Sequence, residues 1–272
     1  MLRKLIESDR EKLMMYLKNE PEINLFIIGD VENFGFNSDF QDLWAYFDDN
    51  GNYEAVLLRY YNSFIFYTHK EDFNLNPVAD KLNKAITNGE ALFISGKKSL
   101  MDNLYPLLPE EKILKVKNTY FTSCNEINKD FPVYHLEKVR YAVTNDIDDI
   151  CDLLDRIDEF ATLRNRPSMV KKIEMNAGKI NYIRDMDNGK VIATASTTAE
   201  NKYSAMIVAV ATDPDFRKKG YASACVYDIT RRLFDEGKSA CLFFDNPEAG
   251  SIYKKLGYKE IDKWVMIQLK QS

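Results

Sequence analysis

The chain has 272 residues, 45% of them hydrophobic and 29% charged, with a formal net charge of −5. This length predicts two domains of roughly 130 residues each, with enough apolar side chains for two packed cores. No apolar run approaches the roughly 20 residues that a membrane span requires. The acidic balance and the lack of a basic stripe argue against a nucleic-acid-binding protein.

The cysteines and histidines form no pattern typical of a metal site or a disulfide framework. They are few and far apart in the sequence: Cys124, Cys151, Cys225, Cys241, His69 and His135. We therefore expect buried free thiols, no metal and a reducing cytoplasmic environment. The first nine residues are charged and amphipathic and lack the apolar core of a signal peptide.

The first half of the chain is predicted to contain both helices and strands. Helical patterns are followed by three strands, a helix, a strand and a last helix. The expected ranges are helices at 2–18 and 22–34, strands at 43–48, 53–60 and 62–68, a helix at 76–88, a strand at 91–95 and a helix at 98–107.

A domain boundary is expected near residue 136. The periodic pattern is lost over residues 125–132, where Pro132 interrupts it, and a new strand begins at Val139. The net charge is −7 over residues 1–137 and +2 over the remainder. The second half is therefore the better place for a site that binds an anionic small molecule.

The second half predicts the order β-α-α-β-β-β-α-β-α-β, which is a mixed α/β (α+β) fold with a largely antiparallel beginning. Its strand–helix unit at 240–256 corresponds to the one at 91–107, which suggests a degenerate internal duplication. The expected ranges are a strand at 139–143, helices at 146–157 and 160–175, strands at 180–184, 190–198 and 205–212, a helix at 218–236, a strand at 240–244, a helix at 247–256 and a final strand at 258–269.

Residues 208–223 combine a buried strand, a turn at Pro214, a basic stretch and the start of a helix. A helix start presents unpaired N–H groups and a partial positive charge. Gly220 allows a close approach of the backbone to an anion, and the small Ala222 avoids crowding it. The bland alternative is a solvated basic face at an ordinary helix start. The position after a long β-prone strand favours a phosphate-binding loop.

In this setting the pattern Pro214-x-x-Arg217-x-x-Gly220-x-Ala222 resembles motif A of the GNAT (Gcn5-related N-acetyltransferase) superfamily. The resemblance implies that backbone amides of the loop bind the pyrophosphate of coenzyme A and that the preceding strand pairs with its pantetheine arm. The cofactor-binding residues that it implies are Val210, Ala211, Thr212, Arg217, Lys218, Lys219, Gly220, Tyr221, Ala222, Ser223 and Asn246.

A second motif surrounds the helix expected at 247–256. Asn246 suits the N-cap of this helix and Gly257 its C′ position. The simplest interpretation of Asn246 is therefore helix capping, and that of Tyr253 is an aromatic side chain packed in the core. The spacing Asn246-x6-Tyr253, followed by a Gly-Tyr pair, is also similar to a second GNAT pattern. The resemblance implies that Tyr253 is catalytic and protonates the departing thiolate, while Asn246 contacts the cofactor.

The general base is not identified. Many GNAT enzymes use a glutamate at one of two positions, and these hold Met206 and Cys241 here. Three explanations remain open: a base elsewhere, loss of the proton to water, or acyl-CoA binding without effective turnover. The candidates elsewhere are Glu159, Glu200 and Asp245.

The resemblance implies a tandem GNAT fold with a mixed central sheet flanked by helices. Residues 1–136 would form a degenerate GNAT-like domain that supports the structure or shapes the acceptor pocket, and 137–272 an acetyl-CoA-dependent N-acetyltransferase. The expected acceptor is a small-molecule or peptide amine that attacks directly, in a monomer or homodimer. The alternatives are a non-catalytic acyl-CoA-binding or scaffold protein and an aminoacyl transferase that uses charged tRNA. The net charge counts against the last.

Overall fold

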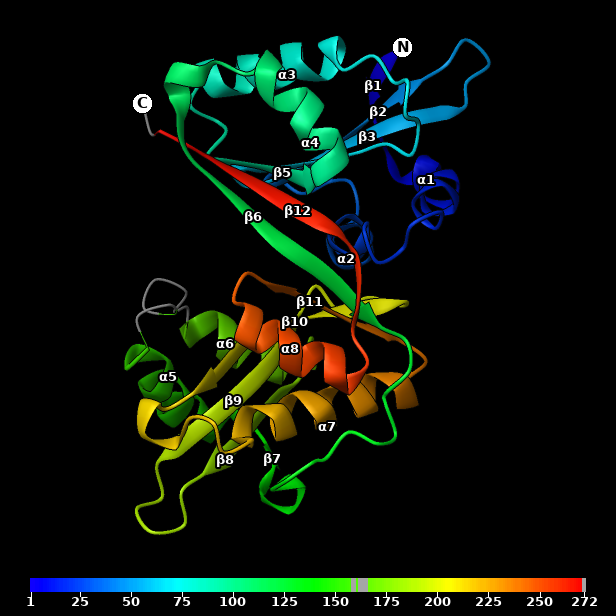
Figure 1. Ribbon diagram of the computed structural model, residues 1–272. Helices are drawn as coiled ribbons and strands as arrows, with labels where there is room; N and C mark the ends of the chain where they lie inside the picture. Colours follow the sequence, from blue (N-terminus) through cyan, green and yellow to red (C-terminus); the bar gives the residue numbers. More distant parts are fainter. Residues whose placement is uncertain (158–159, 161–165, 271–272) are drawn as a thin grey trace. The chain divides into compact units, whose positions relative to one another are not determined.

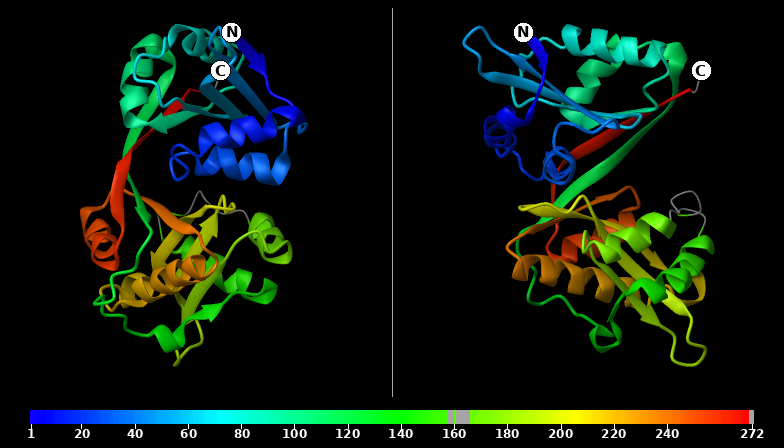
Figure 2. Two further views of the ribbon diagram at one scale, coloured as in Figure 1. Left: turned by 90° about the vertical axis from the view of Figure 1, so that its right-hand side faces the viewer. Right: turned by 180° about the vertical axis from the view of Figure 1, so that it is seen from behind.

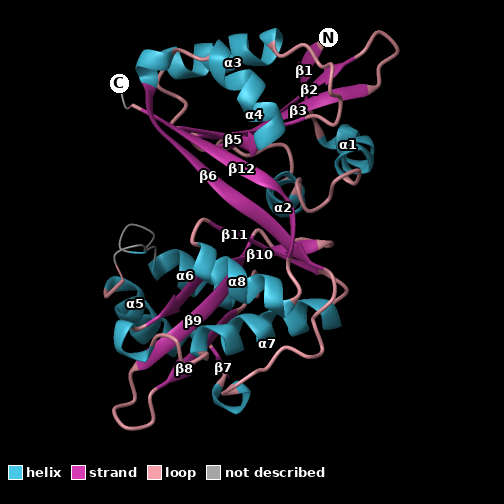
Figure 3. Ribbon diagram, in the orientation of Figure 1, coloured by secondary structure: helices cyan, strands magenta, loops and turns pink. Residues whose placement is uncertain are grey.

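The computed structural model describes residues 1–157, 160 and 166–270. The chain forms two compact units (Figure 1). The first unit combines Met1–Phe121 with the C-terminal segment from Glu260, and the second is Thr122–Lys259. Figure 3 shows that both units contain helices and strands, as a mixed α/β fold requires.

The first unit is built on a mixed sheet. Strands β1 to β4 pair antiparallel in sequence order, β4 pairs parallel with β5, and β5 pairs antiparallel with β12. The elements of this unit are β1 (Leu2–Lys4), α1 (Arg10–Leu17), α2 (Leu25–Phe34), β2 (Gln41–Phe47), β3 (Tyr53–Tyr60), β4 (Ser63–Tyr67), α3 (Asn76–Thr87), β5 (Phe93–Lys97), α4 (Lys98–Leu104), β6 (Ile113–Cys124) and β12 (Lys259–Leu269).

The core of the first unit lies between its sheet and helices α3 and α4. Leu57, Phe64 and Ile94 from the sheet are at most 1% exposed and pack with Val78 and Leu82 of α3. Strand β12 contributes to the same core, because its alternate residues point inward.

The second half of the sequence repeats the order of elements of the first half. In both halves, a strand and a short 3-10 turn precede two helices, three strands, a helix, a strand and a helix, and each half ends on a long strand. The elements of the second unit are β7 (Arg140–Tyr141), α5 (Ile147–Asp155), α6 (Arg166–Glu174), β8 (Ile180–Arg184), β9 (Val191–Thr198), β10 (Ser204–Thr212), α7 (Tyr221–Asp235), β11 (Ser239–Phe244) and α8 (Pro247–Leu256).

Two layers of helices cover the sheet of the second unit. Ile180 and Tyr182 of β8 pack against α5 and α6, whereas the intervening Asn181 bonds to Cys225 and Asp228 of α7. Successive side chains of a strand point to opposite faces, so α7 lies on the face opposite α5. Figure 2 shows α7 and α8 on one face and α5 and α6 on the other. Strands β7 to β10 are antiparallel neighbours, and β10 pairs parallel with β11.

The final strands of the two repeats are exchanged. Strand β12 follows α8 in sequence but lies in the first unit, beside β5. The end of β6 lies in the second unit beside β11, where the Thr122 hydroxyl donates to the Leu242 carbonyl at 3.1 Å. The division at residues 121 and 259 therefore differs from the boundary expected near 136, because pairing across the sheet assigns each final strand.

Most of the expected elements are confirmed, with three differences. The helix expected at 2–18 is a short strand, a 3-10 turn and the helix Arg10–Leu17, since residues 2–4 pair with β2. Strand β6 was not predicted. The expected helix at 160–175 is described as Arg166–Glu174, and residues 161–165 lie outside the described part of the chain.

Candidate functional site

Strand β10 has a β-bulge at the place where the sequence predicts cofactor binding. Its pairing with β9 breaks between Val208 and Ala211, and Ala209 has φ of +52°. Its pairing with β11 ends at the pair of Ile207 with Leu242. Among the described strands, Ala209 and Val210 therefore pair with neither β9 nor β11. Their backbone groups can pair with an extended ligand.

Ala211 and Thr212 follow the bulge and pair with β9 on one side only. Ala211 is 4% exposed and belongs to the core under α5, while Thr212 is partly exposed. Of the three strand residues predicted to line the cofactor, Val210 is thus the one whose backbone the bulge releases.

The loop before α7 is shaped to present backbone N–H groups. Lys218 has φ of +62° and Gly220 φ of +88°, while Lys219 between them has negative φ. Such alternation of φ is typical of an anion-binding nest, a loop in which successive N–H groups face one point. A Cβ at Gly220 would meet only ordinary contacts, at 3.8 Å or more, so the positive φ rather than lack of space requires glycine.

Helix α7 begins directly after this nest with an open N-terminus. Its first intrahelical bond runs from the Ala224 N–H to the Gly220 carbonyl at 3.0 Å. The N–H groups of Tyr221, Ala222 and Ser223 precede that bond, and no side chain caps them. The helix dipole adds positive potential at the same place, so the loop is suited to a phosphate group.

The side chains of Arg217, Lys218 and Lys219 keep their charge available. All three are exposed, and among the described residues none forms an ion pair with a carboxylate. Arg217 bonds to the Thr212 carbonyl at 3.4 Å and Lys219 to the Asp215 carbonyl at 3.2 Å. The loop can therefore offer three cations to an anionic ligand.

His135 fixes this loop and was not predicted as a site residue. Its ring stacks on Tyr221 with centroids 4.3 Å apart, and its Nε2 lies 3.1 Å from the Lys219 carbonyl. No local pattern pointed to it, because it is 84 residues from Lys219 in the sequence. The contact orients Tyr221 at the first position of α7.

Asn246 caps helix α8 as its sequence position predicts. Its Oδ1 accepts a bond from the Glu248 N–H at 2.9 Å, Pro247 occupies the first turn, and Gly257 ends the helix. The capping account of Asn246 is confirmed. Its side chain is exposed at the end of β11, so a cofactor contact stays a prediction.

Tyr253 lies on α8 with an 8% exposed side chain. Its ring is 6.0 Å from those of Phe244 and Tyr258, and burial raises the pKa of Tyr253 to about 12. Its hydroxyl bonds to no other residue in the described part of the protein. A protonated phenol whose hydroxyl is free to bond suits a proton donor.

The close packing of α8 on β11 depends on Gly250. A Cβ at this position would lie 2.3 Å from a ring atom of Phe244. Only glycine therefore lets the helix approach Phe244 this closely, and the approach sets the position of Tyr253 on the same helix.

The residues considered as general base lie in different surroundings. Met206 and Cys241 are 1% and 0% exposed. Glu200 pairs with Lys179 and Lys238, each at 2.7 Å. It precedes the first residue of β10, Ser204, which itself lies about 20 Å along the strand from Val210. Asp245 is exposed beside Asn246, and Glu159 lies outside the described residues.

The corresponding segment of the first unit has none of these features. The ladder between β3 and β4 runs without a break from the pair Tyr60–Ser63 to Val56–Tyr67. The segment at 68–77 contains no glycine, and its Lys70 pairs with Glu54 at 2.8 Å. The first unit thus repeats the order of elements without the phosphate-binding loop.

The described residues hold no cluster of three or more histidine, cysteine, aspartate or glutamate side chains arranged for a metal ion. None of their helices combines the length and the apolar character needed to cross a membrane.

Residues 187–267 match the family model described as FR47-like protein. Over 148 residues the chain is 26% identical to a Pyropia yezoensis protein named uncharacterized N-acetyltransferase ycf52, covering 53% of this chain and 72% of that protein.

Similar folds occur among solved structures. A GCN5-related N-acetyltransferase from Sphaerobacter thermophilus aligns with a TM-score of 0.66 and 12% identity, over 98% of this chain and 94% of that one. A tandem GNAT protein from the clavulanic acid biosynthesis pathway aligns with a TM-score of 0.63 and 12% identity, over 98% and 97%. The family model, the N-acetyltransferase relative and the two motifs together support the GNAT superfamily for this chain, and the solved structures show that its fold is similar to that of a tandem GNAT protein.

Proposed function

We propose that the protein is an acetyl-CoA-dependent N-acetyltransferase whose site lies in the second unit. The observation that carries the proposal is the combination, within one unit, of the β10 bulge at Val210, the nest at Gly220 and the buried Tyr253. Each feature alone occurs in proteins of many functions. Together they supply a strand edge, an anion site and a proton donor.

The loop would hold the pyrophosphate of coenzyme A. The N–H groups from Lys219 to Ser223 would bond to phosphate oxygens, and Arg217, Lys218 and Lys219 would balance their charge. The pantetheine amides would pair with the backbone at Val210, which the bulge leaves outside the β9 and β11 ladders. Bound in this way, acetyl-CoA supplies an activated thioester.

The proposed reaction is direct attack by an amine on the thioester carbonyl. The N–H of Val210 would donate a hydrogen bond to the carbonyl oxygen as negative charge develops there. Tyr253 would donate its proton to the departing thiolate. The phenol is protonated at neutral pH, and a hydroxyl held within hydrogen-bond reach of the sulfur would offset the weaker acidity that burial gives it. The new amide bond forms as the carbon–sulfur bond breaks.

The acceptor is proposed to be a small-molecule or peptide amine. Its ammonium form must lose a proton before attack, since an amine with a pKa near 10 is mostly charged at pH 7. Asp245 is the described carboxylate candidate on the β11 side, directly before Asn246. Deprotonation by water is the alternative.

Acetyl-CoA binding and turnover can be tested separately with Gly220→Glu. The new carboxylate would repel phosphate, so calorimetry should show loss of acetyl-CoA binding and a thiol-release assay with an amine panel should show no turnover. Gly189→Glu is the matched control, because Gly189 also has positive φ, +72°, and no neighbour within 4 Å of a Cβ. Full affinity in Gly220→Glu would remove the loop assignment.

A second candidate is a non-catalytic acyl-CoA-binding protein, favoured by the buried, uncharged Met206 and Cys241. It predicts that acetyl-CoA raises the melting temperature while no amine releases thiol. The first unit is proposed to support the fold or to shape the acceptor site. It lacks a glycine-containing basic loop of its own.

A further inference from the structure

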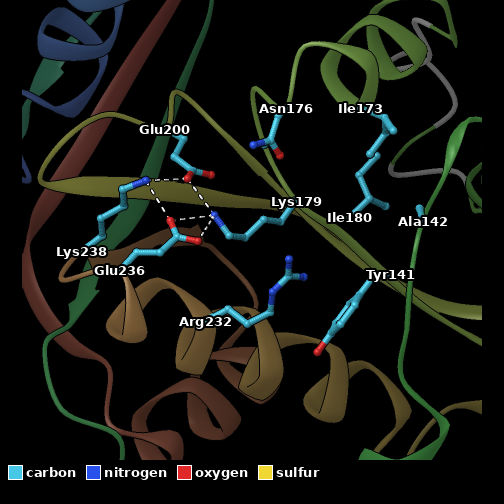
Figure 4. Close-up of a pocket in the computed structure, with 11 residues that line it drawn as sticks. Tyr141, Ala142, Ile173, Asn176, Lys179, Ile180, Glu200, Arg232, Glu236 and Lys238 are labelled. Carbon is cyan, nitrogen blue, oxygen red and sulfur yellow. Dashed lines mark hydrogen bonds and ion pairs between the residues drawn. The ribbon is translucent and has the colours of Figure 1, made fainter.

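A polar cavity of about 360 Å³ lies within the second unit, away from the loop at Gly220. It is bounded by β7, by the turn between α6 and β8, and by the last turns of α7 (Figure 4). Arg232 follows Gly220 by twelve residues, about 18 Å along the helix. The cavity therefore lies toward the opposite end of α7 from the proposed coenzyme A site.

One side of the cavity is a cluster of two lysines and two glutamates. Glu200 bonds to Lys179 and Lys238, each at 2.7 Å. Glu236 bonds to the same two lysines at 2.9 Å. Because these four charges neutralise one another, the cluster forms a fixed wall and offers no unpaired acid to a cation.

Arg232 provides the remaining charge. Its NH1 bonds to the Asn181 Oδ1 at 3.2 Å, and its guanidinium lies 4.1 Å from the centre of the Tyr141 ring. No carboxylate of the described chain pairs with it. A guanidinium carries five N–H donors, so several remain available after the Asn181 bond.

The neighbouring Arg231 differs from Arg232 because it is paired with carboxylates. Its two terminal nitrogens bond to Asp228 at 2.9 Å and to Asp235 at 3.2 Å. Two successive arginines of α7 thus differ in that one is neutralised by carboxylates and the other is not. Arg232 is also partly buried, whereas Arg231 is exposed.

Figure 4 shows the Arg232 guanidinium between the lysine–glutamate cluster and Tyr141, directed toward the Asn176 amide. The guanidinium lies over the Tyr141 ring, and this contact restrains the side chain while leaving most of its N–H donors for an acceptor. Ile173, Ile180 and Ala142 line the other side. The cavity thus places one oriented cation beside a short apolar wall.

We propose that this cavity binds a small carboxylate, whose two oxygens accept bonds from Arg232 and whose aliphatic part lies against the partly exposed Ile173 and Ala142. A bidentate contact between guanidinium and carboxylate is charge-assisted and geometrically specific. The cavity volume lies within the range of small-molecule sites. Inorganic phosphate has the charge but not the apolar part, so it should bind more weakly. The proposal does not depend on the function of the loop at Gly220.

The test is a titration of the full chain with butyrate, its neutral isostere butyramide and inorganic phosphate, followed by NMR of the arginine Nε–Hε groups. Arg232→Gln identifies the Arg232 signal by its loss. The expected result is a saturable shift of this signal with butyrate at millimolar concentration. Butyramide and phosphate should each bind at least tenfold more weakly.

Binding to the variants is followed on the backbone amides of Lys179 and Ile180. Arg232→Gln should weaken butyrate binding at least tenfold, and Arg232→Lys should recover only part of it, because lysine keeps the charge but lacks the fork. Lys171→Gln removes the same charge from the exposed face of α6 outside the cavity and should bind normally. Equal binding of butyrate and butyramide, unchanged affinity in Arg232→Gln, or no shift up to 100 mM butyrate would overturn the proposal.

Discussion

Met206 and Cys241 are register partners in the parallel ladder between β10 and β11, and both are buried. These are the two positions at which the superfamily resemblance leads one to expect a glutamate. Their pairing means that the two alternative base positions lie side by side on neighbouring strands. The chain has an uncharged side chain at both, so neither of these two positions offers a carboxylate to accept a proton.

This pairing predicts an unusual pH profile for the proposed reaction. Without a base at either position, kcat/KM with a primary amine should rise about tenfold per pH unit from pH 6 to pH 9, because the neutral fraction of an amine with a pKa near 10 rises at that rate. Burial raises the pKa of Tyr253 to about 12, so the tyrosine stays protonated throughout this range and adds no downward limb. The measurement is a thiol-release assay at fixed ionic strength.

Asp245→Asn provides the control for this profile. If Asp245 were the base, the wild-type curve would level off above the pKa of its carboxyl, and the variant would lose the plateau. Matching slopes in wild type and variant exclude Asp245. A plateau that survives the substitution instead contradicts the prediction of a base-free site.

Tyr253→Phe should lower kcat by about a hundredfold and leave acetyl-CoA affinity within twofold of wild type. The size follows from the typical contribution of a positioned general acid. The hydroxyl forms no bond to another residue within the described structure, so its removal breaks no contact of the fold. Calorimetry with acetyl-CoA and steady-state kinetics measure the two effects separately.

Tyr227→Phe on α7 is the matched control, since it removes a phenol hydroxyl from a partly exposed tyrosine of the same unit. Its kcat should equal that of the wild type. Equal loss in both variants, or loss in neither, would remove the proposed role of Tyr253.

The sequence predicted the parts of the site that depend on local order. Pro214, Gly220 and Ala222 fall within one strand–loop–helix segment, and Asn246 and Tyr253 fall on one helix start and its second turn, so spacing alone places them. The helix ends were predictable for the same reason, because caps such as Gly257 act within one turn.

What depends on pairing between distant segments was not predictable from spacing. His135 reaches the loop from 84 residues away. Strand β6 has exposed residues on both faces over much of its length, so it lacks the alternation by which strands are recognised. Strand β12 belongs to the first unit because it pairs with β5. The sequence of residues 258–269 contains no pattern that specifies β5 as the pairing strand.

The bond between Thr230 and Tyr258 predicts unequal effects of two substitutions on stability. Their hydroxyl oxygens lie 2.7 Å apart in a fully buried setting, and the Thr230 hydroxyl also bonds to the Val226 carbonyl at 2.8 Å. Thr230→Val leaves the buried Tyr258 hydroxyl unpaired and should lower the free energy of unfolding by about 1–3 kcal/mol. Tyr258→Phe leaves Thr230 bonded to Val226 and should cost less.

Denaturant unfolding of the two single variants and the double variant measures this asymmetry. In the double variant no hydroxyl is left unpaired, so the loss should be smaller than the sum of the two single losses. Additive losses would show that the two hydroxyls are not coupled.

The exchanged position of β12 predicts which unit is weakened when this strand is altered. Ile267 pairs with Ile94 of β5 and is 0% exposed in the core of the first unit. Ile267→Ala should lower the free energy of unfolding of that unit by about 2–5 kcal/mol, as expected for a buried aliphatic truncation. Hydrogen exchange should accelerate at β4 and β5 and stay unchanged at β9 and β10.

Ile261→Ala on the same strand is the control, because Ile261 is 38% exposed and its truncation should lower the free energy of unfolding by about 0.5 kcal/mol or less. Faster hydrogen exchange at β10 and β11, with β5 unaffected, would contradict the assignment of β12 to the first unit. It would mean that β12 completes the sheet of its own repeat.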